Sequence, residues 1–153
     1  MDHKQTPKIL IIDSHDCPGV AHGFCSKFQR HGLEVTLSSD DTDNFDKETM
    51  ILPLLEKQKF DVILFLCSEA YNWDDQRWQV VTFDWSILGW KKRSINADTP
   101  LIAVTTAPDD ETISRFKEVG VTGVIDRGDK PSAKQVSSRV FAELAMRDVL
   151  VAG

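Results

Sequence analysis

Apolar residues gather in five short runs, at residues 8–12, 33–37, 60–67, 100–104 and 121–125. The first run reads Lys-Ile-Leu-Ile-Ile and stops at Asp13, a β-branched pattern typical of strands that are buried on both faces. The third run is the most apolar in the chain, so it predicts the central strand of a sheet. We therefore expect five strands.

A helical pattern follows the first strand. After a turn at residues 18–19, Val20, Phe24 and Phe28 recur every four residues. Gly32 comes next, and glycine suits the position just after a helix end. This spacing predicts the first helix.

Four more helices are expected further along the chain, and the one from Trp78 is described separately below. A polar loop over 38–46 precedes a helix over about 47–57, in which Pro53 must delay the start or bend the axis. Asp109 or Asp110 can cap the next, and Ser132 can cap the last. The first of these two helices has apolar positions at Ile113, Phe116 and Val119 and ends at Gly120. The last helix has its apolar face at Val136, Val140 and Leu144.

Alternating strands and helices favour right-handed crossovers and a parallel sheet between two helical layers. We expect an α/β, flavodoxin-like, doubly wound five-stranded parallel sheet in the order 2-1-3-4-5, with helices on both faces. No internal repeat or linker divides the chain, so residues 1–153 are interpreted as one domain. Residues 1–7 are expected to be a flexible N-terminus, and residues 68–98 an extended connection.

Charge and composition exclude several classes of protein. The formal net charge is −6 and the isoelectric point is near 5.1, which argues against nucleic acid as a partner. The polar start and the short first apolar run predict neither a signal peptide nor a membrane span, so a cytoplasmic protein is expected. Three cysteines without metal-ligand spacing predict small buried apolar side chains rather than zinc ligands or disulfides.

The strand ends resemble those of bacterial response-regulator receiver domains, the CheY-like family. The segments that carry the likeness are residues 9–13, 60–66, 99–105, 120–125 and 130–131, the last being Lys-Pro. The resemblance implies a signal-transduction module of a two-component phosphorelay, not an enzyme. Its partners would be signalling proteins, such as a histidine kinase, or a second copy of the chain.

The resemblance also implies a phosphorylation site, and this chain departs from it. Receivers hold Mg²⁺ on two adjacent acids after the first strand and accept a phosphoryl group on an aspartate that ends the third. Asp13 matches the first acid, but Ser14 takes the place of the second, so only weak Mg²⁺ binding or none is expected. Counting from Asp61 puts the acceptor position at Leu66, or at Cys67 if the strand slips by one.

Two further positions bind the phosphoryl group in receivers, a hydroxyl after the fourth strand and a lysine after the fifth. Thr105 matches the hydroxyl. The lysine position falls on Arg127 by direct counting, or on Lys130 if the loop holds three extra residues. The sequence therefore predicts a pseudo-receiver with an incomplete phosphoacceptor site.

Displaced carboxylates could replace the missing acids. Asp16 could stand in for the second acid, and Glu69, Asp74 or Asp75 could reach the crevice from the connection that follows the third strand. The alternative is that these carboxylates are solvated surface groups, as carboxylates in loops usually are.

The connection after the third strand holds all four tryptophans of the chain. From Trp78 onward a helix is predicted, with one apolar stripe at Trp78, Val81, Trp85 and Leu88 and another at Val80, Phe83, Ile87 and Trp90. One stripe would cover the sheet. The other would be a docking or self-association surface around Trp78, Trp85 and Trp90, or would be covered by another part of the chain.

Two other functions are compatible with the same fold. Residues 13–19 are similar to the Asp-x-His-x-x-Gly motif of cobalamin-binding domains, although Pro18 stands where the motif has glycine. A shift of the cobalamin spectrum that depends on His15 would support this alternative. A flavodoxin-like enzyme is the other alternative, but no Gly-rich phosphate loop or Ser-His-Asp set supports it.

Overall fold

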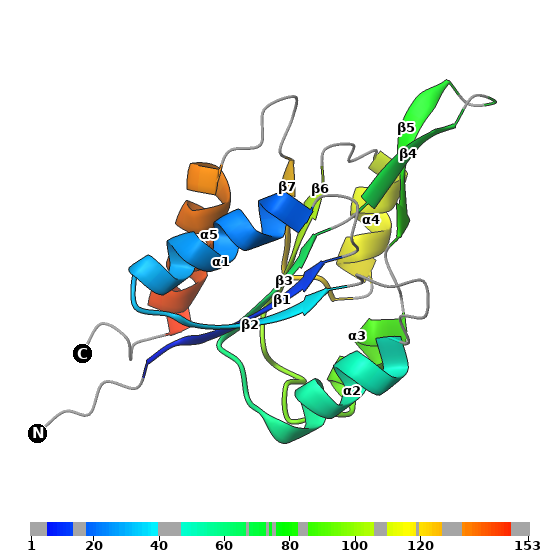
Figure 1. Cartoon of the computed structure of the whole chain (residues 1–153). Coiled ribbons are helices and arrows are strands. Elements are labelled where there is room, and N and C mark those ends of the chain that lie inside the picture. Colours follow the sequence, from blue (N-terminus) through cyan, green and yellow to red (C-terminus); the bar gives the residue numbers. More distant parts are fainter. Residues whose placement is uncertain are drawn as a thin grey trace, which may run out of the picture.

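The computed structural model describes residues 6–13, 18–39, 47–66, 68–72, 74, 76–82, 86–105, 110–118, 120–126 and 133–147. Figure 1 shows a central twisted sheet between two layers of helices. In chain order the elements are β1 (Lys8–Asp13), α1 (Pro18–Arg30), β2 (Glu34–Ser39), α2 (Lys47–Lys57), β3 (Val62–Leu66), β4 (Ser68–Asn72), β5 (Arg77–Thr82), α3 (Ser86–Lys92), β6 (Leu101–Thr105), α4 (Asp110–Glu118), β7 (Gly123–Asp126) and α5 (Ala133–Arg147).

The main sheet has five strands in the order β2-β1-β3-β6-β7, and all neighbouring strands in it are parallel. This is the predicted 2-1-3-4-5 order, counting only the strands of this sheet. The doubly wound fold expected from the sequence is therefore confirmed. In this order the carboxyl ends of β1 and β3 lie side by side at the point where the chain changes direction across the sheet.

Two apolar clusters fill the space between the sheet and its helices. On one face Val62, Leu64 and Leu66 of β3 pack with residues of α1 and α5, and on the other Ile63 and Phe65 pack with residues of α2, α3 and α4. All five residues of β3 are buried. The prediction that this run forms the central strand is confirmed.

Outside residues 68–98 the helix boundaries agree with the sequence except at Pro18. Gly32 and Gly120 have φ values of 84° and 88°, the left-handed conformation in which glycine commonly follows a helix. Pro18 begins α1 instead of lying in a turn before it, because the first helical position needs no N–H donor. Pro53 lies inside α2, which nevertheless begins at Lys47, so its start is not delayed.

The prediction of a helix from Trp78 is wrong. Residues Ser68–Asn72 and Arg77–Thr82 instead form an antiparallel hairpin, and α3 covers only Ser86–Lys92. Gln76 closes the hairpin with a φ of 54°. Aromatic and β-branched residues in β5 fit a strand as well as a helical stripe, and pairing with β4 decides between them. Trp78 therefore belongs to a strand and shares no helical stripe with Leu88.

The remaining part of the apolar segment contributes to the core. Ile87 is buried, and Leu88 and Trp90 are half-buried against the cluster that lines the α2 side of the sheet. The proposed interface residue Trp90 thus has a packing role, and the side chain of Trp78 and residue Trp85 lie outside what the structure describes. Cys25 is partly buried against the other cluster, and Cys17 and Cys67 are outside the described residues. In the described part of the chain, no helix is long and apolar enough to cross a membrane.

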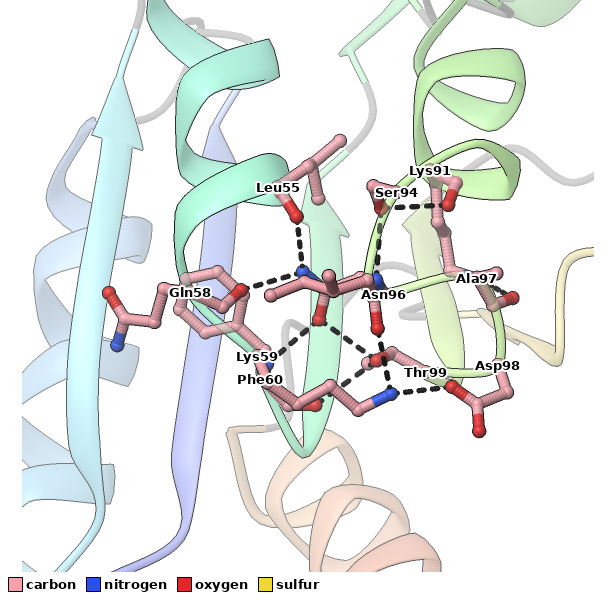
Figure 2. Close-up of polar contacts among 11 residues, drawn as sticks. Leu55, Gln58, Lys59, Phe60, Lys91, Ser94, Asn96, Ala97, Asp98 and Thr99 are labelled. Atoms are coloured by element: carbon pink, nitrogen blue, oxygen red, sulfur yellow. Dashed lines mark hydrogen bonds and ion pairs between the residues drawn. The ribbon is translucent and has the colours of Figure 1, made fainter.

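A buried asparagine ties the end of α2 to the segment before β6 (Figure 2). Asn96 is 0% exposed. Its Nδ2 donates to the carbonyls of Leu55 and Gln58 at 2.8 and 2.7 Å. Its Oδ1 accepts from the backbone N–H of Phe60 at 2.8 Å and lies 2.9 Å from the hydroxyl of Thr99. All four hydrogen-bonding positions of the amide are therefore used.

Two lysines make further contacts around this asparagine. Lys59 pairs with Asp98 and also donates to the carbonyl of Ile95 at 3.0 Å. Lys91, from the basic end of α3, donates to the carbonyl of Ala97 at 3.0 Å. We name this set of contacts around Asn96, which lies just before β3 and β6 begin, the Asn96 clamp.

We predict that Asn96→Ala lowers the free energy of unfolding by about 3 kcal/mol, because it leaves the buried Phe60 N–H and Leu55 carbonyl unpaired. The melting temperature should fall by roughly 9 °C for a chain of this length. Asn96→Asp keeps the shape but loses both amide donors, so it should destabilise the protein to a similar extent. Urea unfolding followed by circular dichroism measures both.

Asp98→Ala is the matched control for these variants. It removes the exposed pair with Lys59, and exposed ion pairs contribute at most about 1 kcal/mol. If Asp98→Ala and Asn96→Ala lower the free energy of unfolding equally, the buried amide is not the main stabilising group of the clamp.

Candidate functional site

The carboxyl edge of the main sheet is the candidate site. The parallel register places Asp13 level with Leu66, Leu66 level with Val104, and Val104 level with Ile125. Neighbouring strands are about 4.8 Å apart, so Asp13 and Leu66 are direct neighbours at this edge. This row puts Leu66 beside the first acid of the receiver pattern.

Leu66 ends β3 as a core residue. Its exposed fraction is 5%, and it packs in the cluster formed with α1 and α5. Leucine follows from the burial of β3 on both faces, since a charged group there would lose its hydration. At the position predicted for the phosphoacceptor, the chain therefore offers a buried apolar side chain. Cys67, the alternative position, is outside the described residues.

Thr105 ends β6, two strands away from Asp13 across the sheet. At the usual strand spacing this separation is roughly 10 Å, and β3 lies between the two strands. The structure thus brings the backbone positions of Asp13, Leu66 and Thr105 to one edge. Ser14, Asp16, Arg127 and Lys130 lie outside the described residues, as does His15 of the cobalamin alternative.

The proposed substitutes Glu69 and Asp74 belong to the hairpin, which extends from the carboxyl edge of the sheet (Figure 1). Glu69 is the second residue of β4 and is level with Val80 of β5. Asp74 is exposed in the connection between the two strands. Five residues of β4 span roughly 17 Å, so Asp74 is a strand length away from the end of β3. Asp75 is not among the described residues.

Sequence reasoning missed one carboxylate of this edge. Asp126 ends β7 and is level with Thr105. The signal was present, because an acid directly follows the last apolar run. Asp126 is three strands from Asp13, roughly 14 Å, which is too far for both to bind one metal ion.

Asp61, the acid used for counting, has a structural role at the opposite edge. Its carboxylate accepts a hydrogen bond from the backbone N–H of Lys8 at 2.7 Å, and its own N–H donates to the Lys8 carbonyl at 2.8 Å. These bonds fix the start of β3 against the start of β1. They therefore help to set the register that places Leu66 beside Asp13.

The described side chains form no complete metal site. No group of three or more histidine, cysteine, aspartate or glutamate residues in that part of the chain could hold an ion.

Comparison with known proteins identifies the fold. No family model matches the chain, and no curated protein matches its sequence. Solved structures do match. A two-component response regulator from Clostridium difficile has a TM-score of 0.68 and 16% identity, over 94% of this chain and 99% of that chain. The fold is that of receiver domains.

Two further receiver structures support this result. The chemotaxis protein CheY4 of Vibrio cholerae has a TM-score of 0.63 and 20% identity, over 89% of this chain and 98% of that chain. The receiver domain of the sensor histidine kinase PA1611 from Pseudomonas aeruginosa has a TM-score of 0.64 and 15% identity, over 92% of this chain and 99% of that chain. That protein has a magnesium ion coordinated in its active-site cleft. The resemblance to receivers that the strand ends predicted is thus confirmed in the fold.

We predict that Leu66→Asp lowers the free energy of unfolding by about 4 kcal/mol at neutral pH, because it removes buried apolar contacts and desolvates a carboxylate. Leu66→Met conserves volume and should cost less than about 1.5 kcal/mol. Urea unfolding of the two variants measures the difference. Equal stability of Leu66→Asp and the parent chain would mean that position 66 faces an open crevice.

Proposed function

We propose that this chain is a receiver-like signal-transduction module that works by protein binding and does not accept a phosphoryl group. The observation that carries the proposal is the burial of Leu66 beside Asp13, at the acceptor position of a receiver fold. The receiver neighbours support the general role in two-component signalling.

The chemistry at position 66 supports the absence of phosphorylation. A receiver forms an acyl phosphate when a carboxylate oxygen attacks the phosphorus of the donor. Leu66 has no oxygen in its side chain and is closed off by the core. Cys67, the next residue, has a thiol and cannot form an acyl phosphate either.

The residues of the edge do not fit a receiver's Mg²⁺ site. Mg²⁺ prefers near-octahedral oxygen ligands and usually takes one or two carboxylates from the protein. Here the acid pair is reduced to Asp13 followed by Ser14, and the neighbouring buried Leu66 cannot ligate an ion. Weak binding through Asp13 is the most that this donor set supports, so phosphorylation through a bound ion is not part of the proposal.

The proposed module acts through the surfaces of its receiver fold, in the cytoplasm. A signalling protein such as a histidine kinase, or a second copy of the chain, is the expected class of partner. Thr105, Arg127 and Lys130 would then be remnants of a phosphoryl-binding site or contacts for another anion.

We predict no phosphoryl transfer from a small phosphodonor. Intact mass should stay unchanged after incubation with acetyl phosphate and Mg²⁺, because the acceptor position lacks a carboxylate. Beryllofluoride, which mimics the phosphoryl group where acceptor and metal site are complete, should leave the tryptophan fluorescence unchanged. A receiver with its full set of acids, treated in parallel, shows that the reagents are active.

A stoichiometric gain of one phosphoryl group would overturn this proposal. Replacing Asp13, Asp16, Glu69 or Asp74 one at a time would then identify the displaced carboxylate, since only the true acceptor or a metal ligand would abolish the gain.

A further inference from the structure

The β4–β5 hairpin is a separate two-stranded sheet. Among the described residues its strands pair only with each other, so each has one outer edge of N–H and C=O groups without a strand partner there. The hairpin projects from the carboxyl edge of the main sheet (Figure 1). Two-stranded hairpins are marginally stable alone, and a free strand edge is a template for another strand.

We propose that β5 pairs with β5 of a second copy of this chain, joining two hairpins into a four-stranded antiparallel sheet. The partner must be an extended strand, because only a strand presents N–H and C=O groups at the spacing of this edge. A two-fold pairing of identical strands closes on itself and yields a dimer.

The residues of β5 are self-complementary in one register. When Gln79 faces Gln79 of the second copy, Trp78 faces Val80 in both directions, and aromatic residues opposite β-branched ones stabilise sheets. The four residues from Arg77 to Val80 keep a regular register with β4, and the shift comes only beyond Val80. In this register Arg77 does not lie opposite Arg77 of the second copy, so the two charges do not oppose each other.

The other possible pairings are less favourable. Pairing β4 with β4 about Ala70 would place Glu69 diagonally across from its own copy, and like charges at that range repel. β4 also contains serine, glutamate, alanine and asparagine, residues that strands disfavour or use little. Pairing β4 with β5 of another copy leaves both outer edges free, which builds an open chain instead of a closed dimer.

Sedimentation velocity of the full chain over a concentration series tests the proposal. A reversible monomer–dimer equilibrium is expected. Val80→Lys puts a new charge on the pairing edge of both copies and should raise the dissociation constant about fivefold or more. Ala70→Lys, the matched control, adds the same charge to the other strand of the hairpin and should leave the constant within about twofold of the parent's.

A cysteine placed on the two-fold axis tests the register. Gln79→Cys brings two thiols within disulfide reach, because paired antiparallel residues have Cα atoms about 5 Å apart. Mild oxidation should give a covalent dimer with Gln79→Cys but not with Ala70→Cys, its neighbour across the hairpin, nor with the parent chain, which controls for the natural cysteines.

A monomer at every concentration would overturn the proposal. So would a dimer whose dissociation constant is unchanged by Val80→Lys, or a dimer in which Ala70→Cys forms the disulfide as fast as Gln79→Cys. The inference does not rest on the absence of phosphorylation. A monomeric chain would leave the phosphodonor result untouched, and phosphoryl uptake would leave the sedimentation result untouched.

Discussion

The burial of β3 on both faces is the constraint on which the rest of the structure depends. Val62, Leu64 and Leu66 fill one cluster, while Ile63 and Phe65 fill the other, so this strand joins the two halves of the core. A charged side chain in such a strand would lose its hydration, which destabilises the folded state. The same packing that holds the fold together thus places a buried leucine, Leu66, beside Asp13 at the carboxyl edge of the sheet.

The two ends of β3 serve different purposes. At its start the Asn96 clamp and the Asp61 carboxylate fix the strand with buried or partly buried hydrogen bonds. At its end the chain continues into the hairpin, which is held by pairing between its own two strands. The strand is therefore anchored by side-chain hydrogen bonds at its start and leads at its other end into a hairpin that projects from the carboxyl edge of the main sheet (Figure 1).

The sequence predicted the main sheet because strands buried on both faces leave continuous apolar runs between helical patterns. The prediction failed at the hairpin because the same segment fits two patterns. Trp78, Val80 and Thr82 have the two-residue spacing of a strand, whereas Trp78, Val81 and Trp85 have the spacing of a helix. Partners far along the chain, such as Leu55 and Phe60 for Asn96, have no local signal. At the site, counting along strands placed Leu66 beside Asp13, but the loop residues Asp16 and Arg127 cannot be located by counting.

The order of the strands also affects how the protein folds while it is being synthesised. β1 can pair with β2 early, but the hydrogen bond between Lys8 and Asp61 joins residues 53 positions apart. The centre of the sheet therefore cannot close until the chain beyond β3 has left the ribosome. Until then any pairing of β1 with β2 leaves the other edge of β1 without its native neighbour β3, and an unpaired apolar strand edge exposes a growing chain to association with other chains.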